Sequence, residues 1–285
     1  MSRSTIIEHR SDVARAQWDA AADGWNGQTQ HLRRWLASAT DAMLDMADVR
    51  PGMRVLDVAA GAGDQSCDIA RRVGADGAVL VTDLSPRMLA AAALNLRAAG
   101  HEGVSTFVAD GEALGLDAAN FDAALCRLGL MFFANPLRGL QSIRRALRPG
   151  GRFGAMVFSG PSTNPCIDIV VSIAMRSAGL SAQGIDRPGE LMSLSKPGLI
   201  GDLFGTAGFV DVEVRRIDAP LRLASVDQYL AFLRTAAGPI MTILDQIDEA
   251  SRQAAWDEIA ETLDGFASPG GWEAPTELLL AAGAR

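Results

Sequence analysis

The stretch Arg54–Asp64 constrains the fold of this chain more than any other. Its first half is a short apolar run that predicts a buried strand, and its second half carries Gly61 and Gly63 in a predicted turn. Asp64 then opens a helical pattern. A strand, a glycine turn and a helix in this order let the backbone approach a ligand closely, because no Cβ atom stands in the way.

A second apolar run, 78–82, ends directly before Asp83, which lies 20 residues after Gly63. An acidic residue at this spacing is placed to accept hydrogen bonds from the hydroxyls of a ribose. The two features together predict a pocket for a cofactor that contains adenosine.

The glycine spacing bears on which cofactor this is. The dinucleotide fingerprint needs a third glycine where this chain has Ser66, so that helix and strand can pack around a pyrophosphate. Asp57 stands at the end of the predicted strand, where it would repel a pyrophosphate and suit a cationic ligand, such as an amino group beside a sulfonium. A nicotinamide-dependent oxidoreductase is therefore the weaker interpretation.

Composition limits the remaining classes. The chain has 285 residues, of which 48% are apolar and 21% charged, as expected for one α/β domain with insertions. Its 34 acidic and 26 basic residues leave a formal net charge of −8, which disfavours nucleic acid and anionic membranes as partners. The 3 cysteines are widely spaced and match neither a disulfide framework nor a metal site. With no predicted signal peptide and no membrane span, we expect a cytoplasmic protein.

Apolar runs that predict strands alternate with helical patterns, which calls for a parallel sheet covered on both faces. After the first two, these runs are 104–109, 121–126 and 153–158. Ligands bind at the carboxyl ends of such strands. Four candidate residues fall at these ends: Asp57, Asp83, Asp110 and Cys126.

Two segments carry a family resemblance. Asp57-Val-Ala-Ala-Gly-Ala-Gly63 resembles the first motif of the class I S-adenosylmethionine-dependent methyltransferases, with Ala59 where that family often has glycine. Alanine at this position is expected to limit contacts that need a positive φ. Cys126-Arg-Leu-Gly-Leu-Met-Phe-Phe133 resembles the segment after the fourth strand in the type 11 branch, which includes ubiquinone/menaquinone methyltransferases. The resemblance covers residues 51–158.

The resemblance implies an α/β, Rossmann-like fold: a seven-stranded, mostly parallel sheet with helices on both faces and helical lid insertions. Residues 1–50 would form an N-terminal helical lid, and 51–285 the methyltransferase domain. Helical insertions are expected near 159–197 and 222–270. The apolar run Thr276–Ala282 would be the antiparallel seventh strand.

The implied cofactor is S-adenosyl-L-methionine, with S-adenosyl-L-homocysteine as product. Carried onto this chain, the cofactor-binding residues would be Trp25, Asp57, Ala59, Gly61, Ala62, Gly63, Gln65, Asp83, Leu84, Met88, Asp110, Gly111, Glu112, Cys126 and Arg127. Three of them have an equally ordinary structural alternative: packing for Trp25, a turn cap for Asp110 and an ion pair for Arg127.

The resemblance implies transfer of a methyl group to oxygen or carbon of a small, fairly apolar acceptor, such as a quinol, a phenol or a natural product. Nitrogen methylation of an amine or lipid headgroup, and S-adenosylmethionine binding without catalysis, remain alternatives. His31 is the weak candidate for a catalytic base, and Tyr229 has the same standing. The oligomeric state is open, with a homodimer as one alternative.

Overall fold

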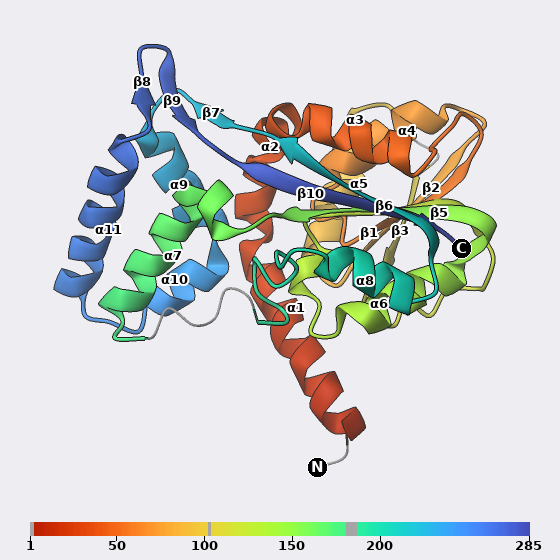
Figure 1. The fold of residues 1–285 in the computed structure, drawn as a ribbon, viewed down its shortest axis with the longest axis horizontal. Coiled ribbons are helices and arrows are strands. Elements are labelled where there is room, and N and C mark those ends of the chain that lie inside the picture. Colours follow the sequence, from red (N-terminus) through yellow and green to blue (C-terminus); the bar gives the residue numbers. More distant parts are fainter. Residues whose placement is uncertain (1–2, 102–103, 181–186) are drawn as a thin grey trace.

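The computed structural model describes residues 3–101, 104–180 and 187–285 (Figure 1). Residues 181–186 of the predicted insertion 159–197 lie outside the described residues. The main feature is a seven-stranded sheet in the order β3-β2-β1-β4-β5-β10-β6. This arrangement confirms the predicted Rossmann-like fold.

The predicted strands are present, four of them within two residues of their expected bounds, whereas the strand predicted at 153–158 begins six residues earlier, at Leu147. The parallel strands are β1 (Arg54–Val58), β2 (Ala78–Asp83), β3 (Val104–Val108), β4 (Phe121–Arg127) and β5 (Leu147–Phe158). The predicted seventh strand is β10 (Glu277–Ala284), which runs antiparallel between β5 and β6 (Val210–Asp218). In the register, Leu56 of β1 pairs with Leu80 of β2 and Ala124 of β4, so an apolar layer crosses the centre of the sheet.

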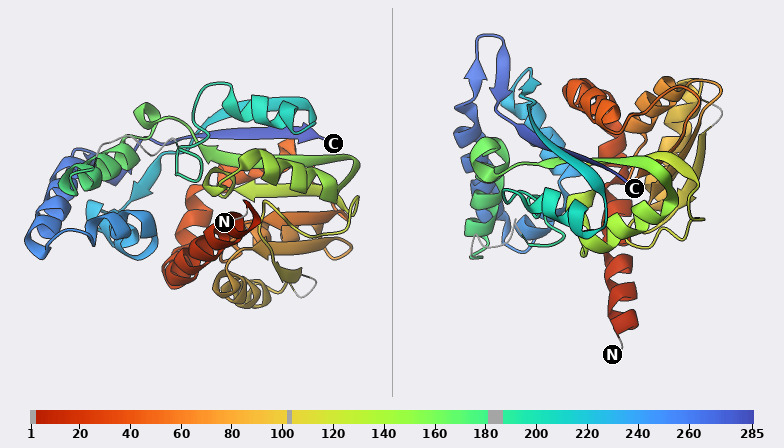
Figure 2. Two further views of the ribbon diagram at one scale, coloured as in Figure 1. Left: turned by 90° about the horizontal axis from the view of Figure 1, so that it is seen from below. Right: turned by 45° about the vertical axis from the view of Figure 1, so that its right-hand side comes forward.

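Helices cover both faces of the sheet (Figures 1 and 2). α4 (Asp64–Val73) and α5 (Pro86–Ala98) connect strands that progress in one direction from β1, whereas α6 (Pro136–Ala146) connects β4 and β5, which progress in the other. Because such crossovers are right-handed, the two groups lie on opposite faces. α3 (Ala37–Met46) joins the first group and α8 (Leu199–Thr206) the second. The strand order changes direction between β1 and β4, where ligands of such sheets bind.

Local capping explains where two of these helices begin. Ser85 accepts a hydrogen bond from the backbone N–H of Met88 at 3.0 Å, and Pro86 occupies the first turn of α5. Asn135 caps α6 in the same way, accepting from the N–H of Arg138 at 3.0 Å. Both caps follow strand ends, so they help position the loops there.

The insertions form a second unit beside the sheet (Figure 1). Its helices are α7 (Pro165–Ser177), α9 (Val226–Ala236), α10 (Gly238–Leu244) and α11 (Glu249–Asp264). They enclose their own apolar core, which includes the buried Trp256, Ile259 and Trp272. A small sheet, β7-β9-β8, was not predicted, because its strands β7 (Leu221–Leu223), β8 (Ala267–Ser268) and β9 (Gly271–Ala274) are too short to show an alternating pattern.

A two-stranded ribbon joins the two units. β6 continues into β7 and β9 continues into β10, and both segments pair antiparallel. At the joint between them the N–H of Ala219 donates to the carbonyl of Thr276 at 2.8 Å. The ribbon is visible in Figure 1 as the teal and blue strands that run from the sheet to the insertion.

The N-terminal helices lie between these units. α1 (Arg3–Gly27) is one long helix that contacts α5 on the sheet side and α9 and α10 on the insertion side (Figure 2). At Gly24 the approach is so close that an added Cβ would lie 1.8 Å from the carbonyl oxygen of Thr235. α2 (Thr29–Trp35) follows, and short 3-10 turns, Leu130–Phe132 and Pro161–Thr163, come after β4 and β5.

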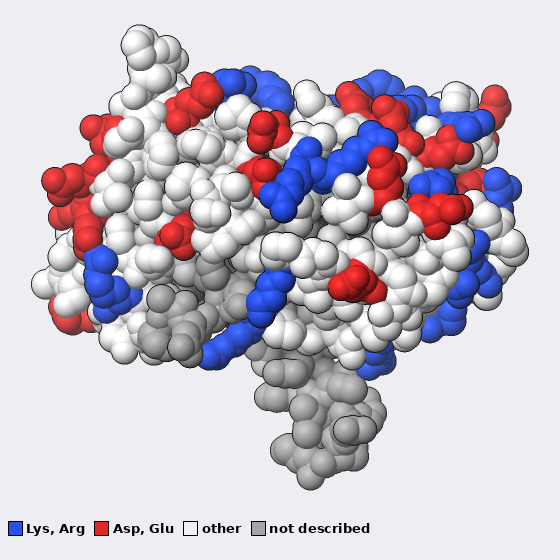
Figure 3. Space-filling model, viewed as in Figure 1, with Lys and Arg blue, Asp and Glu red and all other residues white. Residues whose placement is uncertain are grey.

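The surface carries charges of both signs (Figure 3). On the face viewed there, red and blue side chains interleave over the sheet, and acidic side chains gather on the outer side of the insertion. Within the part of the chain that the structure describes, no helix combines the length and the apolar character that crossing a bilayer requires.

Candidate active site

A cavity of about 1050 Å³ opens at the carboxyl ends of β1, β2 and β4 and reaches under the insertion. At one end its wall is the turn Ala59–Ala62 together with Asp83. At the other end the wall is apolar and includes Val170, Leu233 and Ile240. The site therefore has a polar half on the sheet and an apolar half on the insertion.

The turn after β1 holds a backbone geometry that favours glycine. Gly61 has a φ of 56° and donates its N–H to a carboxylate oxygen of Asp83 at 2.9 Å. Ala59 was expected to limit positive φ, but it adopts a φ of 54° itself. A Cβ built on Gly129 would lie 2.5 Å from the Cβ of Ala59, so close packing against a glycine accommodates Ala59 in this strained conformation.

Asp83 faces the cavity with a carboxylate that the backbone already orients. One oxygen accepts from Gly61, and the other accepts from the N–H of Ser85 at 2.9 Å. Burial raises the pKa of Asp83, and these backbone N–H groups oppose the rise. Each oxygen keeps a free lone pair, so the carboxylate can also accept hydrogen bonds from a diol. Leu84 and Met88 line the cavity beside it.

Asp110, Gly111 and Glu112 line the cavity after β3. Asp110 caps its turn by accepting from the N–H of Glu112 at 2.9 Å, and it also accepts from the hydroxyl of Ser11 on α1 at 2.8 Å. A Cβ on Gly111 would lie 2.2 Å from the ring of Phe133, so this glycine makes room for that ring. The turn-cap alternative for Asp110 is thus present in the structure, together with a contact to α1.

Asp57 and Gln65 lie behind the turn and do not line the cavity. Asp57 is 0% exposed, and its two oxygens accept from Gln65 Nε2 and Ser66 Oγ, each at 2.6 Å. Burial raises the pKa of Asp57 to about 7, while these two hydrogen bonds oppose the rise. Ser66, at the position of the missing third glycine, therefore holds the first strand to α4. The geometry gives Asp57 no direct contact with a ligand in this cavity.

Gly63 and Cys126 also lie away from the cavity. A Cβ on Gly63 would come within 2.8 Å of the Cβ of Ala92, so this residue lets α4 and α5 approach each other. Cys126 is 0% exposed, and burial raises the pKa of its thiol. A thiolate nucleophile is disfavoured there.

Arg127 lies at the floor of the cavity and pairs with Asp64; both side chains are 8% exposed. Its guanidinium also donates to the hydroxyl of Thr40 at 3.2 Å. The predicted alternative of an ion pair at the strand end is present. Because both partners line the cavity, the pair presents fixed charges of both signs to a ligand.

The N-terminal helices contribute two buried nitrogen atoms that have no hydrogen-bond partner in the part of the chain that the structure describes. They are Trp25 Nε1 and His31 Nε2, and both side chains line the cavity. The Trp25 ring packs edge-on against Phe232 of α9 with centroids 5.8 Å apart. Burial, assisted by the nearby charge of Arg34, lowers the pKa of His31 below its ordinary 6.5, so the neutral imidazole dominates at pH 7.

Hydrogen bonds fasten α1 over the cavity, and the sequence carried no signal for them. Asp19 accepts from the hydroxyl of Ser85 and from the N–H of Arg87, the latter at 3.2 Å. Farther along α1, Asn26 accepts from Asn95 at 2.8 Å. Single polar residues on a long helix do not disclose their partners, so these contacts, like that of Ser11, could not be found by spacing.

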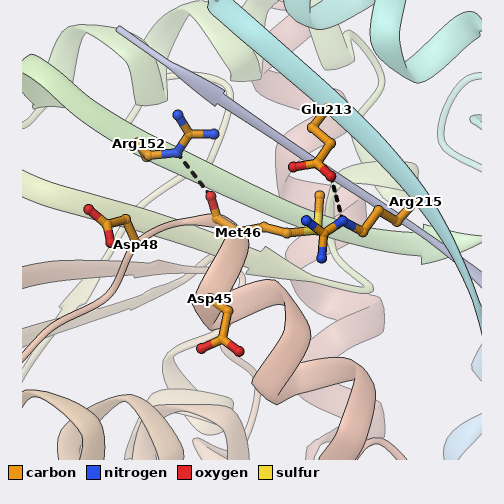
Figure 4. A pocket seen from close by; sticks show the side chains of 6 residues that line it. All are labelled: Asp45, Met46, Asp48, Arg152, Glu213 and Arg215. Atoms are coloured by element: carbon orange, nitrogen blue, oxygen red, sulfur yellow. Dashed lines mark hydrogen bonds and ion pairs between the residues drawn. The ribbon is translucent and has the colours of Figure 1, made fainter.

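A second hollow, of about 360 Å³, lies between the end of α3 and strands β5 and β6 (Figure 4). Arg215 pairs with Glu213 at 2.5 Å, and Arg152 donates to the carbonyl of Met46 at 2.9 Å. Because these charged groups already have partners on the surface, we take the cavity at the strand ends as the functional site.

Known proteins share this fold. YcgJ from Bacillus subtilis, at 17% identity, has a TM-score of 0.58 over 87% of this chain and 98% of its own. The [4+2]-cyclase SpnF, at 20% identity, has a TM-score of 0.53 over 86% of this chain and 80% of its own. At these identities the likeness concerns the fold, and the sheet with its strand-end cavity defines the class I methyltransferase fold.

Sequence comparison then identifies the family. Residues 29–171 match the ubiE/COQ5 methyltransferase family, and the chain belongs to it. The ubiquinone/menaquinone biosynthesis C-methyltransferase UbiE of Idiomarina loihiensis is 40% identical over 119 residues, which cover 41% of this chain and 47% of that protein. UbiE of Pseudomonas aeruginosa (strain LESB58) is 36% identical over 122 residues, covering 42% and 48%. The chain thus spans about half the length of these curated relatives.

Proposed function

We propose that this protein transfers a methyl group from S-adenosylmethionine to oxygen or carbon of a small, largely apolar acceptor. The observation that carries the proposal is the single cavity that joins the polar turn after β1 to the apolar compartment of the insertion. A donor held at one end and an acceptor at the other can be aligned for an in-line displacement.

The residues of the polar half fit the cofactor. Asp83 would accept from the ribose hydroxyls, and Asp110 and Glu112, which line the cavity, would lie beside the adenine. The backbone of Gly61 and Ala62 and the Arg127–Asp64 pair would hold the methionine end. The bound cofactor supplies an electrophilic methyl group on a sulfonium. Asp57, Gln65 and Gly63 lie behind the turn after β1. They would contribute indirectly, by stabilising the conformation of that turn.

Trp25 and the N-terminal helices would close the site. α1 bridges the two halves of the cavity, and we propose that α1 and α2 of the predicted lid 1–50 close over it together with the insertions near 159–197 and 222–270, whereas α3 packs on the sheet. A closed lid excludes water, which strengthens the electrostatic interactions within the site. The aromatic face of Trp25 can meet a sulfonium by a cation–π interaction.

His31 is the proposed proton acceptor. Its Nε2 is buried, lacks a partner among the described residues and belongs to a side chain that lines the cavity. A neutral imidazole at this place can take the proton from a hydroxyl or from an acidic C–H of the acceptor. The UbiE relatives are named as C-methyltransferases, which supports carbon as one accepting atom.

Binding and turnover test the proposal. Calorimetry should show binding of S-adenosylmethionine and S-adenosylhomocysteine but not of NAD, and incubation with a panel of quinols and phenols should produce S-adenosylhomocysteine. Binding without turnover would favour the non-catalytic alternative, and NAD binding would favour an oxidoreductase. A homodimer and a cytoplasmic location are part of the proposal, and sedimentation and cell fractionation would test them.

A further inference from the structure

Three polar side chains gather at the apolar end of the cavity. Cys166 of α7, Tyr229 of α9 and Thr276, directly before β10, line the cavity and are 1%, 4% and 4% exposed. Their surroundings are apolar and include Leu221 and Leu233. Three separate parts of the chain therefore bring hydrogen-bonding groups to one place inside an apolar compartment.

These groups are poorly satisfied by the protein. The hydroxyl of Thr276 is buried, and among the described residues it meets only the thiol of Cys166, without a well-formed hydrogen bond. The hydroxyl of Tyr229 faces the thiol of Cys166, and a thiol is a weak partner. A buried hydroxyl without a good partner destabilises the folded protein. Such groups in a cavity wall point to a ligand that satisfies them.

The position of Thr276 in the sheet determines how far this cluster lies from the end of β4. Thr276 precedes Glu277, the first residue of β10, and Leu278 pairs with Phe158 at the carboxyl end of β5. In the order β4-β5-β10, Thr276 thus lies two strands away from the end of β4. At ~4.8 Å for each neighbouring pair, the separation across the sheet is roughly 10 Å; Leu280 is level with Arg127, and the four residues from there to Thr276 add roughly 13 Å along the strand.

Aromatic rings line the path between these two points. Tyr229 stacks with Phe232 at 6.3 Å, Phe232 meets Trp25 at 5.8 Å, and Trp25 meets Trp18 at 6.4 Å. Trp18 then packs edge-on against Phe132, just after β4, at 5.0 Å. All five rings line the cavity, so they suit a planar ligand that reaches from one end to the other.

We propose that Tyr229 and Thr276, beside Cys166, form a distal anchor for a hydroxyl or carbonyl oxygen of the acceptor, at the end of the cavity away from the atom that is methylated. The ligand class is a rigid, largely apolar, ring-containing molecule with oxygen at its far end. This inference rests on the proposed function, because it assigns the acceptor end of the same cavity. Tyr229 and Thr276 lie outside the residues that match the family, 29–171.

A pair of probes that differ by one hydroxyl tests the anchor. 4,4′-Dihydroxybiphenyl and 4-hydroxybiphenyl are titrated by calorimetry into the protein saturated with S-adenosylhomocysteine, so that no turnover is needed. The dihydroxy compound should bind about tenfold more tightly, as expected for one additional buried hydrogen bond. In the double variant Tyr229→Phe, Thr276→Val the affinity ratio should fall close to one.

The control is Thr242→Val, which removes an exposed hydroxyl from α10 of the same insertion and should keep the wild-type ratio. S-Adenosylhomocysteine affinity, measured first, reports whether each variant retains its donor half. Equal binding of the two probes to the wild type, no binding of either probe, or an unchanged ratio in the double variant would overturn the anchor. Wild-type protein that fails to bind S-adenosylhomocysteine would instead reject the proposed function itself.

Discussion

The two halves of the cavity are built in different ways. In the donor half, backbone N–H groups of neighbouring turns hold the carboxylates of Asp83 and Asp110 in place. In the acceptor half, polar groups are few, and the hydroxyl of Thr276 meets only the weakly bonding thiol of Cys166 among the described residues. The first half is organised by local motifs at strand ends, and the second by the meeting of separate helices. In the proposed function, the donor half therefore suits one fixed ligand, while the acceptor half selects the molecule that is modified.

His31, on α2 between the halves, should give the largest effect when changed. His31→Gln is expected to lower kcat by about 10²–10³-fold, because a general base is lost, with little change in S-adenosylhomocysteine affinity. Since burial lowers the pKa of His31 below 6.5 and the base must be neutral, the wild-type rate should decline only below pH 6.5. Arg34→Gln should move that decline to higher pH. An unchanged kcat in His31→Gln would remove the base from the proposal.

Asp83→Ala should weaken the binding of S-adenosylmethionine, the ligand of the donor half. Loss of the carboxylate removes the contacts to the ribose and the anchor of the Gly61 N–H, so the Kd for S-adenosylmethionine should rise about 100-fold. Isothermal titration measures it, and Asp76→Ala, an exposed acid in the loop before β2, serves as control. Equal affinity of the two variants would contradict the ribose assignment.

Gly24→Ala should disturb the lid between the halves. The new Cβ would overlap the Thr235 carbonyl, 1.8 Å away, so α1 must move off α9. We expect about a tenfold rise in acceptor KM and faster proteolysis of α1, consistent with overpacking costs of about 1–3 kcal/mol. Val13→Ala, at an exposed position of the same helix, should have neither effect. Wild-type behaviour of Gly24→Ala would show that the helix contact is dispensable.

Ala59→Gly should give the smallest effect and affect only the donor half. Because Ala59 has a φ of 54°, glycine should relieve strain and raise the free energy of unfolding by about 0.5–1 kcal/mol. The neighbouring Ala60 has no positive φ, so Ala60→Gly should lower the free energy of unfolding by a similar amount. Urea denaturation compares them. Destabilisation of both variants to the same extent would argue against strain at Ala59.

The fold and the polar half of the site could be predicted from the sequence, because their signals are local. Strand runs and the glycine turn are local signals, and the right-handed crossover rule converts them into a sheet whose ends meet, which brought Asp83 and Asp110 to one cavity. The direction of the Asp57 side chain was not predictable, because it depends on donors from Gln65 and Ser66 on another element. The distal cluster was equally hidden: Cys166, Tyr229 and Thr276 meet only after the insertion packs against the sheet.

The ribbon formed by β6–β7 and β9–β10 has an evolutionary consequence. Helices α9, α10 and α11 of the insertion connect the two strands of this ribbon. The ribbon is held together by the hydrogen bond between Ala219 and Thr276, which does not depend on the residues of these helices. The helices between β7 and β9 can therefore be lengthened, shortened or exchanged without breaking the strand pairing of the central sheet. New acceptor preferences can therefore arise by replacing the outer helices, while the methyl-donor pocket is inherited unchanged.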